Sequence, residues 1–308
     1  MRALRALLAA VLVGLLPTAC GEANAFPEDT TMARIKARGI LTVGIKFDQP
    51  IFGYKDPASG RITGFDAEMA RLVAKDLTGS ERNIRFVETV SSKREDFIEQ
   101  GVVDLVIATY SITPTRAKRV TFTEPYYYAG QDLLVRVGDS TINQVADLKG
   151  KTVCTARGST SVDRLETTVP GIHLTVVDAY SICVPALIAG RVDAVSTDDT
   201  ILLGLYAQHP DTLRLVGKPF AREPYGMGMR KQDTAFRDYL NGLIARWLCN
   251  GEWDRAYMAT VGSPAPPPNP PNRHLPGPIA EQNDHKPFRG TCGSYGYANA
   301  DRHEEREA

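Results

Sequence analysis

The sequence predicts an α/β protein built from two consecutive α/β units, and three observations support this fold class. Short apolar runs of strand length alternate with amphipathic segments of helix length along most of the chain, which is the pattern of mainly parallel sheets. The alternation occurs once before and once after the extended segment Thr121–Arg136. A length of 308 residues also exceeds one typical hydrophobic core.

The first unit reads β-α-β-α-β after a short N-terminal helix. Gly39 and Gly79 follow two of the helical patterns, as glycine does at helix C-termini. The expected elements are the helices Ala33–Gly39, Gly64–Leu77 and Lys93–Gln100, the strands Ile40–Ile45, Ile84–Val87 and Leu105–Ala108, the loop Lys46–Tyr54 and the hairpin turn Asp56–Gly60.

The second unit repeats the alternation after Thr121–Arg136. It is expected to contain a turn of helix at Val145–Leu148, the strands Thr152–Thr155, Leu174–Val177, Val192–Ser196 and Leu213–Val216, a helix from Ser159 to about Thr168, and the helices Cys183–Ala189 and Thr200–His209. The extended segment Tyr225–Arg230 is expected to return the chain to the first unit. The amphipathic helices Asp233–Asn250 and Glu252–Tyr257 would complete that unit.

The N-terminus has the three-part pattern of a secretory signal. Arg2 and Arg5 precede the apolar run Ala6–Leu16, and the sequence PTAC follows. PTAC resembles the lipobox of bacterial lipoproteins, which implies a signal peptide over 1–20 and a lipid on Cys20. The protein is therefore expected to be exported and anchored at the outer face of the cell membrane. A plain signal peptide cut near Ala25 is the alternative.

Two further segments differ in composition from the folded units. Residues 21–32 are expected to form a flexible tether, and residues 263–308 are rich in proline and polar side chains. Such a composition cannot bury a core, which predicts a disordered tail.

Charge and cysteine usage exclude several function classes. Lys and Arg balance Asp and Glu at 36 each, which gives no indication of a nucleic-acid partner. The spacing of the cysteines fits no metal site, and no cofactor is implied. Because export permits disulfides, Cys154 and Cys183, which fall in the same region of the second unit, are predicted to pair. Two buried free thiols are the alternative.

A polar strand end lies within Asp104–Arg116. Pro114 suits the first position of a short helix, which would place Arg116 in its first turn, beside the hydroxyls of Thr109, Tyr110, Ser111 and Thr113. Open α/β sheets bind small ligands at the carboxyl ends of their strands, and arginine grips a carboxylate with two parallel hydrogen bonds. These residue types predict a carboxylate site. The alternative is a surface turn in which the hydroxyls only cap.

The chain resembles family 3 of the bacterial extracellular solute-binding proteins, the polar amino acid receptors of ABC importers, from about Ala33 to Val261. The segments that carry the resemblance are Gly64-Phe65-Asp66, Thr109–Arg116 and DAVSTD at Asp193–Asp198. The segments KFDQP, ATYSIT, GST, TDDTIL and GKPF are most similar to the glutamate-binding lipoproteins of actinobacterial importers.

The resemblance implies the two-lobed periplasmic-binding-protein fold of type II. Its lobes are joined by two crossing strands and close about a hinge. Lobe 1 would comprise residues 33–125 and 225–262, and lobe 2 would comprise residues 126–224.

The resemblance also implies a site for an amino acid between the lobes. Arg116 would bind the α-carboxylate together with Ser159 and Thr160, which begin a helix whose N–H groups and dipole favour an anion. Asp198 would bind the α-ammonium, and Asp199 is its rival for this role. Thr109 and Ser111, from the polar strand end within Asp104–Arg116, would assist Asp198.

Three residues after the first strand are expected to select the side chain. A cation at Lys46 fits a side-chain carboxylate and repels a cationic ligand, although a solvated loop lysine is the alternative. Gln49 can hydrogen-bond a carboxylate or an amide, and Phe52 is expected near the aromatic wall of the family's site or in the core. Together they predict glutamate, then aspartate, with glutamine and asparagine still open.

The resemblance implies a monomeric receptor that performs no catalysis and delivers its ligand to the permease subunits of an ABC importer. A sensor for a membrane signalling partner is one alternative. A dehydratase acting on cyclic amino acid precursors, as in some relatives, is another. It would need a free general acid facing the cleft, and no glutamate stands at the predicted strand ends.

Overall fold

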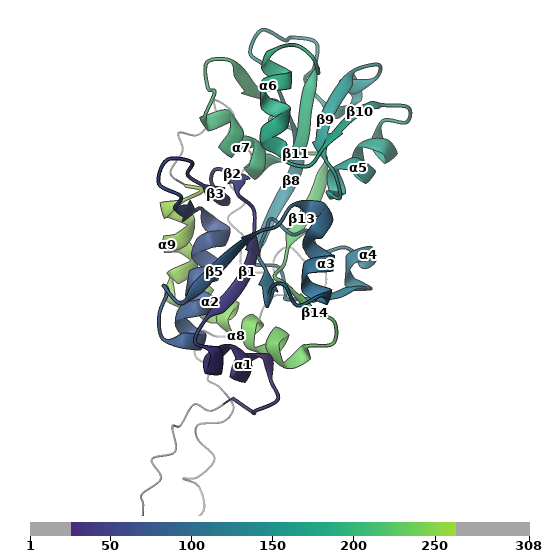
Figure 1. Cartoon of the computed structure of the whole chain (residues 1–308). Coiled ribbons are helices and arrows are strands. Elements are labelled where there is room, and N and C mark those ends of the chain that lie inside the picture. Colours follow the sequence, from purple (N-terminus) through teal and green to yellow (C-terminus); the bar gives the residue numbers. More distant parts are fainter. Residues whose placement is uncertain (1–25, 263–308) are drawn as a thin grey trace, which may run out of the picture.

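The computed structural model describes residues 26–262, which fold into two lobes stacked one above the other. Figure 1 shows lobe 1 below and lobe 2 above, with a pair of long strands passing between them. Each lobe has its own sheet with helices packed against it. The predicted two-lobed α/β fold is confirmed.

Lobe 1 combines an N-terminal part with a C-terminal return of the chain. Its strands are β1 (Leu41–Ile45), β2 (Asp48–Gln49), β3 (Gly53–Lys55), β4 (Ile62–Thr63), β5 (Ile84–Glu88), β6 (Leu105–Val106), β7 (Val120–Phe122) and β14 (Gly228–Arg230). Its helices are α1 (Thr31–Arg38), α2 (Phe65–Thr78), α3 (Arg94–Glu99), α4 (Pro114–Ala117), α8 (Thr234–Asn250) and α9 (Glu252–Ala259), and a 3₁₀ turn, η1, covers Ser91–Lys93. The main sheet has the order β5-β1-β6-β14-β7, and β14 runs antiparallel to both of its neighbours.

Lobe 2 contains the second α/β unit. Its strands are β8 (Tyr127–Arg136), β9 (Thr152–Ala156), β10 (His173–Val177), β11 (Ala194–Asp198), β12 (Leu213–Leu215) and β13 (Ala221–Tyr225). Its helices are α5 (Thr160–Thr168), α6 (Cys183–Ile188) and α7 (Asp199–Ala207), with 3₁₀ turns η2 (Val145–Leu148) and η3 (Tyr180–Ile182). Strands β9, β10 and β11 are parallel, whereas β8 is antiparallel to β11, β12 and β13.

Strands β8 and β13 are the two connections between the lobes. They pair antiparallel over five residues, from Tyr127 opposite Tyr225 to Gln131 opposite Ala221. Strand β8 leaves lobe 1 and enters the sheet of lobe 2, and β13 brings the chain back toward β14 (Figure 1). A bend of this ribbon would change the angle between the lobes without breaking either sheet.

Several element boundaries differ from the expected ones for local reasons. Helix α1 begins at Thr31 rather than Ala33, because Thr30 caps it by accepting a hydrogen bond from the N–H of Ala33. Strand β6 ends at Val106, two residues earlier than predicted, shortly before Thr109, whose φ is positive. Strand β11 runs through Asp198, two residues further than predicted. The loop Lys46–Tyr54 contains β2 and the start of β3, which pair as a hairpin.

The core of lobe 2 is reinforced covalently. Cys154 on β9 and Cys183 on α6 form the predicted disulfide, with 5.6 Å between their α-carbons. Both residues lie in an apolar cluster with Leu134, Leu187 and Val195. The bridge therefore ties a helix to the face of the sheet that it covers.

The predicted signal peptide, the lipidation site Cys20 and the tail 263–308 lie outside the described residues. Between residues 26 and 262, no helix combines the length and the apolar character needed to cross a membrane.

Candidate functional site

A small cavity lies between the lobes, at the carboxyl ends of β6, β9 and β11. This is the edge at which open α/β sheets bind ligands. Lobe 1 lines it with Ser91, Arg94, Thr109, Ser111 and Arg116, and lobe 2 with Ser159, Thr160, Ser161, Tyr180, Thr197, Asp198 and Ile201. Six of the predicted site residues are among them: Thr109, Ser111, Arg116, Ser159, Thr160 and Asp198.

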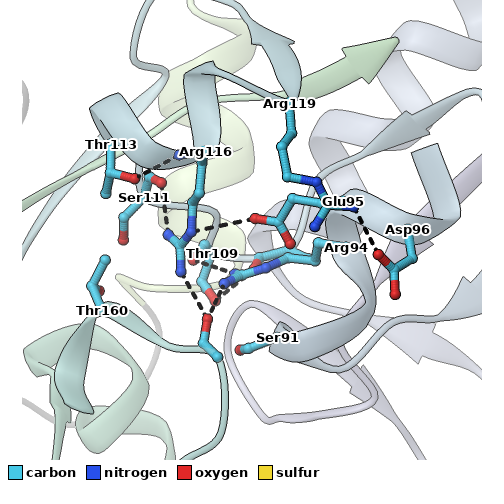
Figure 2. A network of polar contacts seen from close by, with 12 residues as sticks. Ser91, Arg94, Glu95, Asp96, Thr109, Ser111, Thr113, Arg116, Arg119 and Thr160 are labelled. Atoms are coloured by element: carbon cyan, nitrogen blue, oxygen red, sulfur yellow. Dashed lines mark hydrogen bonds and ion pairs between the residues drawn. The ribbon is translucent and has the colours of Figure 1, made fainter. Parts of the chain in front are cut away.

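Arg116 points into the cavity from the first turn of α4. Thr113 caps this helix by accepting a hydrogen bond from the N–H of Arg116, with Pro114 at its start, so the local sequence fixes where the arginine begins. Its Nη1 donates to Ser111 O at 2.7 Å, and its Nε lies 3.5 Å from Glu95 Oε1. The residue is only 8% exposed, and it is held mostly by lobe 1 (Figure 2).

A second arginine, Arg94, was not identified from the sequence. It begins α3, is 2% exposed, and donates through Nη1 to the carbonyls of Ala108 and Thr109 at 3.1 and 3.3 Å. Burial and the nearby Arg116 lower its pKa to about 10, so it is still charged at neutral pH. Its Nε has no hydrogen-bond partner among the described residues. Figure 2 shows the two guanidinium groups next to one another.

Thr109 has a backbone conformation that is unusual for a residue with a side chain. Its φ is +43°, which costs about 1 kcal/mol or more unless the surroundings hold it. Asp66 accepts its N–H at 2.8 Å, Arg94 donates to its carbonyl, and its hydroxyl donates to Gln49 at 3.0 Å. The strand end is therefore fixed in shape by other residues of lobe 1 before any ligand binds.

Asp198 is the acid that faces the cavity from lobe 2. Its Oδ2 accepts a hydrogen bond from the Tyr225 hydroxyl, while its Oδ1 is buried without a hydrogen-bond partner among the described residues. Burial, followed by the nearby carboxylate of Glu223, raises its pKa well above the usual range. Asp199 instead uses Oδ1 to accept the N–H groups of Gly130 and Thr200. Its carboxylate is thus occupied away from the cavity.

The start of α5 presents backbone donors to the same space. Ser159 occupies the N-cap position without a side-chain cap bond, because its hydroxyl donates to Ala156 O at 2.7 Å. The Thr160 hydroxyl donates to Glu223 Oε2 at 2.9 Å. The first N–H groups of a helix have no partner within it, so an anion in the cavity can accept from them.

Four predicted site residues lie outside the cavity lining. Lys46 is 3% exposed and donates through Nζ to Ser91 Oγ at 2.8 Å. Ser91, which lines the cavity, therefore lies between Lys46 and the cavity. Gln49 likewise reaches the cavity only through Thr109. Burial, then the charge of Arg94, lowers the pKa of Lys46 to about 7. The solvated-lysine alternative is wrong, because this side chain is buried.

The two predicted aromatic residues have packing roles. Phe52 belongs to the core of lobe 1, where its ring lies edge-on to those of Phe65, Tyr127 and Tyr225. The Tyr110 ring packs against both arginines, and its centroid lies 4.3 Å from Arg94 Cζ and 5.2 Å from Arg116 Cζ. Tyr110 therefore supports the site without lining it.

The site has the chemistry of a binding pocket for a charged polar molecule. Charged groups and hydroxyls line a small space, and Ile201 is the single aliphatic side chain among the described residues that line it. Within residues 26–262 there is also no cluster of three or more His, Cys, Asp or Glu side chains that could hold a metal ion.

The chain was compared with known families, curated proteins and solved structures. The family model of bacterial extracellular solute-binding proteins, family 3, matches residues 41–262. Glutamate-binding protein GluB of Corynebacterium efficiens is 38% identical over 264 residues, covering 82% of this chain and 88% of the relative. ABC transporter glutamine-binding protein GlnH of Bacillus subtilis is 36% identical over 242 residues, covering 78% and 88%.

Among solved structures, the chain is similar to the ancestral amino acid-binding protein AncCDT-1, a precursor of cyclohexadienyl dehydratase. The TM-score is 0.69 at 29% identity, and the match covers 75% of this chain and all of the other.

Proposed function

The chain belongs to family 3 of the bacterial extracellular solute-binding proteins, and we propose that it captures an acidic amino acid, glutamate before aspartate, between its lobes. One observation carries this proposal. Two arginines and one aspartate line the cavity, all of them buried. An acidic amino acid carries two carboxylates and one ammonium, so its charges complement those of the lining one for one.

The α-amino acid group is assigned to residues from both lobes. Arg116 and the N-terminus of α5 at Thr160 bind the α-carboxylate, and Asp198 Oδ1, which has no other partner in the described part of the chain, accepts from the α-ammonium. Ser111 and Thr109 add polar groups beside it. In this arrangement the α-carboxylate accepts hydrogen bonds from donors of the protein, and the α-ammonium donates to an acceptor of the protein.

The side-chain carboxylate is assigned to Arg94, supported by Lys46 through Ser91. The Nε of Arg94 is a buried donor without a partner among residues 26–262, and Lys46 adds a second cation behind Ser91. A ligand carboxylate adds a negative charge beside both cations, whereas an amide does not, so an amide is expected to bind more weakly. The GlnH relative keeps glutamine as the alternative ligand.

Export, lipid anchoring at Cys20 and delivery to an ABC permease complete the proposal. They rest on the N-terminal pattern and on family membership. We further propose that the receptor acts as a monomer. A signalling partner in place of the permease would use the same cleft.

Calorimetric titration of ligand-stripped protein with glutamate, aspartate, glutamine and asparagine tests the ligand. Glutamate is expected to bind most tightly. Lys46→Ala should weaken glutamate by about tenfold while changing glutamine by less than about threefold, because only the carboxylate uses the charge. Lys36→Ala, on the exposed side of α1, is the matched control. Tighter binding of an amide than of glutamate would refute the assignment of the side-chain site.

One observation favours a second candidate, an enzyme of the dehydratase kind. Burial, then the nearby carboxylate of Glu223, raises the pKa of Asp198, which favours the proton-bearing form that a general acid needs. AncCDT-1 is an amino acid-binding protein that was the precursor of such an enzyme. Incubation with a cyclohexadienyl amino acid precursor, followed by chromatography for a dehydrated product, separates the two. Glutamate binding without product supports the receptor.

A further inference from the structure

The loop between β9 and α5 carries the carbonyl of Gly158 across the cleft. This oxygen, which belongs to lobe 2, accepts hydrogen bonds from Nη2 of Arg116 at 2.9 Å and from Nη2 of Arg94 at 3.4 Å. Both arginines come from lobe 1, and their guanidinium groups lie next to one another (Figure 2). A single backbone oxygen of one lobe thus contacts both ligand-binding cations of the other.

The contact depends on the absence of a side chain at Gly158. A Cβ placed on this residue would lie 2.7 Å from Ser92 Cα and 2.9 Å from Ser92 N, which are backbone atoms of lobe 1. Backbone atoms cannot turn aside as the end of a long side chain can. The φ of Gly158 is also +73°, a conformation that glycine adopts without strain.

We infer that Gly158 is a positioning residue of this site: its carbonyl fixes the orientation of Arg94 and Arg116 only when the lobes are closed. The inference rests on the proposed function, since these arginines are assigned to the two carboxylates. Each terminal guanidinium nitrogen carries two N–H groups, so the bond to Gly158 leaves one for a ligand. Opening of the cleft withdraws the carbonyl and removes one hydrogen bond from each guanidinium group, while the bonds to Ala108, Thr109 and Ser111 of lobe 1 remain. Closure therefore completes the orientation of both arginines.

Two alanine variants separate this role from simple backbone strain. Gly158→Ala adds the Cβ that meets Ser92. Gly150→Ala is the matched control, because Gly150 also lies in lobe 2 with a φ of +73° but has no atom within 4 Å of the added Cβ. Both variants carry the same penalty for a side chain at positive φ, and only one obstructs closure.

Calorimetry and stopped-flow dissociation on the whole chain give the first test. Gly158→Ala is expected to weaken glutamate binding at least about tenfold and to raise the dissociation rate by a similar factor. Gly150→Ala should lose comparable thermal stability but keep the affinity of the unmodified protein. Equal affinities for the two variants would overturn the inference.

Small-angle X-ray scattering without ligand gives the second test, on a second variant as well. Ser92→Leu adds bulk on the lobe 1 side of the same contact without changing a glycine, so it remains informative if Gly158→Ala does not fold. Gly158→Ala and Ser92→Leu should each have a larger radius of gyration than the unmodified protein and Gly150→Ala.

The two tests distinguish the failure of each claim. A larger radius in both variants, in a protein that binds no acidic amino acid, would refute the proposed function and retain the role of Gly158 in closure. Tight glutamate binding with an unchanged radius and an unchanged affinity in both variants would refute the role of Gly158 and retain the proposed function.

Discussion

The two sides of the cleft hold the groups that we propose bind the ligand in different ways. On the lobe 1 side, Arg94 and Arg116 are fixed mainly by backbone carbonyls of their own lobe, those of Ala108, Thr109 and Ser111. On the lobe 2 side, Thr160 and Asp198 bond to side chains of the crossing strand β13, Glu223 and Tyr225. Lobe 1 therefore offers a site that is shaped in advance, whereas the groups of lobe 2 are linked to one of the two strands that join the lobes.

This difference suggests an order of events. A ligand that meets the open protein finds the arginines of lobe 1 already oriented by three of their bonds, which preorganises that half of the site. Lobe 2 then adds its groups as β8 and β13 bend. Changes on the lobe 1 side are expected to affect every step of binding, and changes on the lobe 2 side mainly the closed state.

The largest effect is expected from removing the principal cation of lobe 1. Arg116→Ala should weaken all amino acid ligands by about a hundredfold or more, because the buried α-carboxylate loses its bidentate partner. Arg119→Ala is the matched control, since Arg119 lies three residues further along and its side chain is 46% exposed, in surface ion pairs with Asp96 and Glu99. Calorimetry measures both. A loss of less than about fivefold for Arg116→Ala would contradict the proposed role of lobe 1.

A smaller effect is expected from replacing Asp198, the acid of lobe 2: ligand binding should weaken while the stability of the unliganded protein increases. Asp198→Asn keeps an acceptor for the Tyr225 hydroxyl but removes the charge that meets the ammonium, so ligands should bind about tenfold to a hundredfold more weakly. The unliganded protein should become more stable, because burial and Glu223 disfavour the charged form of Asp198 and raise its pKa.

Titration calorimetry and thermal unfolding measure the two signs for Asp198→Asn. Asp199→Asn is the control, as its carboxylate bonds only to backbone N–H groups in the described structure, and its affinity should stay within about twofold. Weaker binding without a gain in stability would contradict the second sign, because it would show that the folded, unliganded protein does not disfavour the charged form of Asp198.

The smallest effect is a pH dependence on the lobe 1 side. The pKa of Lys46 is about 7 in the unliganded protein because of burial and Arg94, and a bound side-chain carboxylate would raise it. Binding of glutamate above pH 7 then takes up a proton, so the affinity should fall as the pH rises above 7, by about tenfold in total. Titrations from pH 6 to about pH 9 measure this slope. Glutamine, or the Lys46→Ala variant with glutamate, should show a much flatter profile.

The sequence was informative where local chemistry determines position. Thr113 and Pro114 predicted the start of α4 and hence the place of Arg116. Asp198 was predicted from the resemblance of Asp193–Asp198 to the family's acidic strand end, and in the structure it ends β11 directly before α7. Arg94 could not be predicted, since its place in the cavity depends on how α3 packs against the end of β6, and no local pattern separates a buried helix-start arginine from an exposed one.

Tertiary packing also explains why two predicted residues lie behind the site. Phe52 and Lys46 were placed near the ligand from their position after the first strand, but the hairpin formed by β2 and β3 turns Phe52 into the core of lobe 1. Lys46 is covered by Ser91, a residue 45 positions further along the chain. The positive φ of Thr109 likewise depends on Asp66, Gln49 and Arg94, which lie far from it in the sequence.

The nearly complete absence of aliphatic side chains among the described lining residues has a thermodynamic consequence. A ligand that enters this cavity exchanges water for hydrogen bonds and ion contacts rather than for apolar surface. Association of this kind releases heat and is opposed by the entropy of ordering. An exothermic equilibrium shifts toward the free state on warming, so the protein would retain its ligand more firmly in a cold medium than in a warm one.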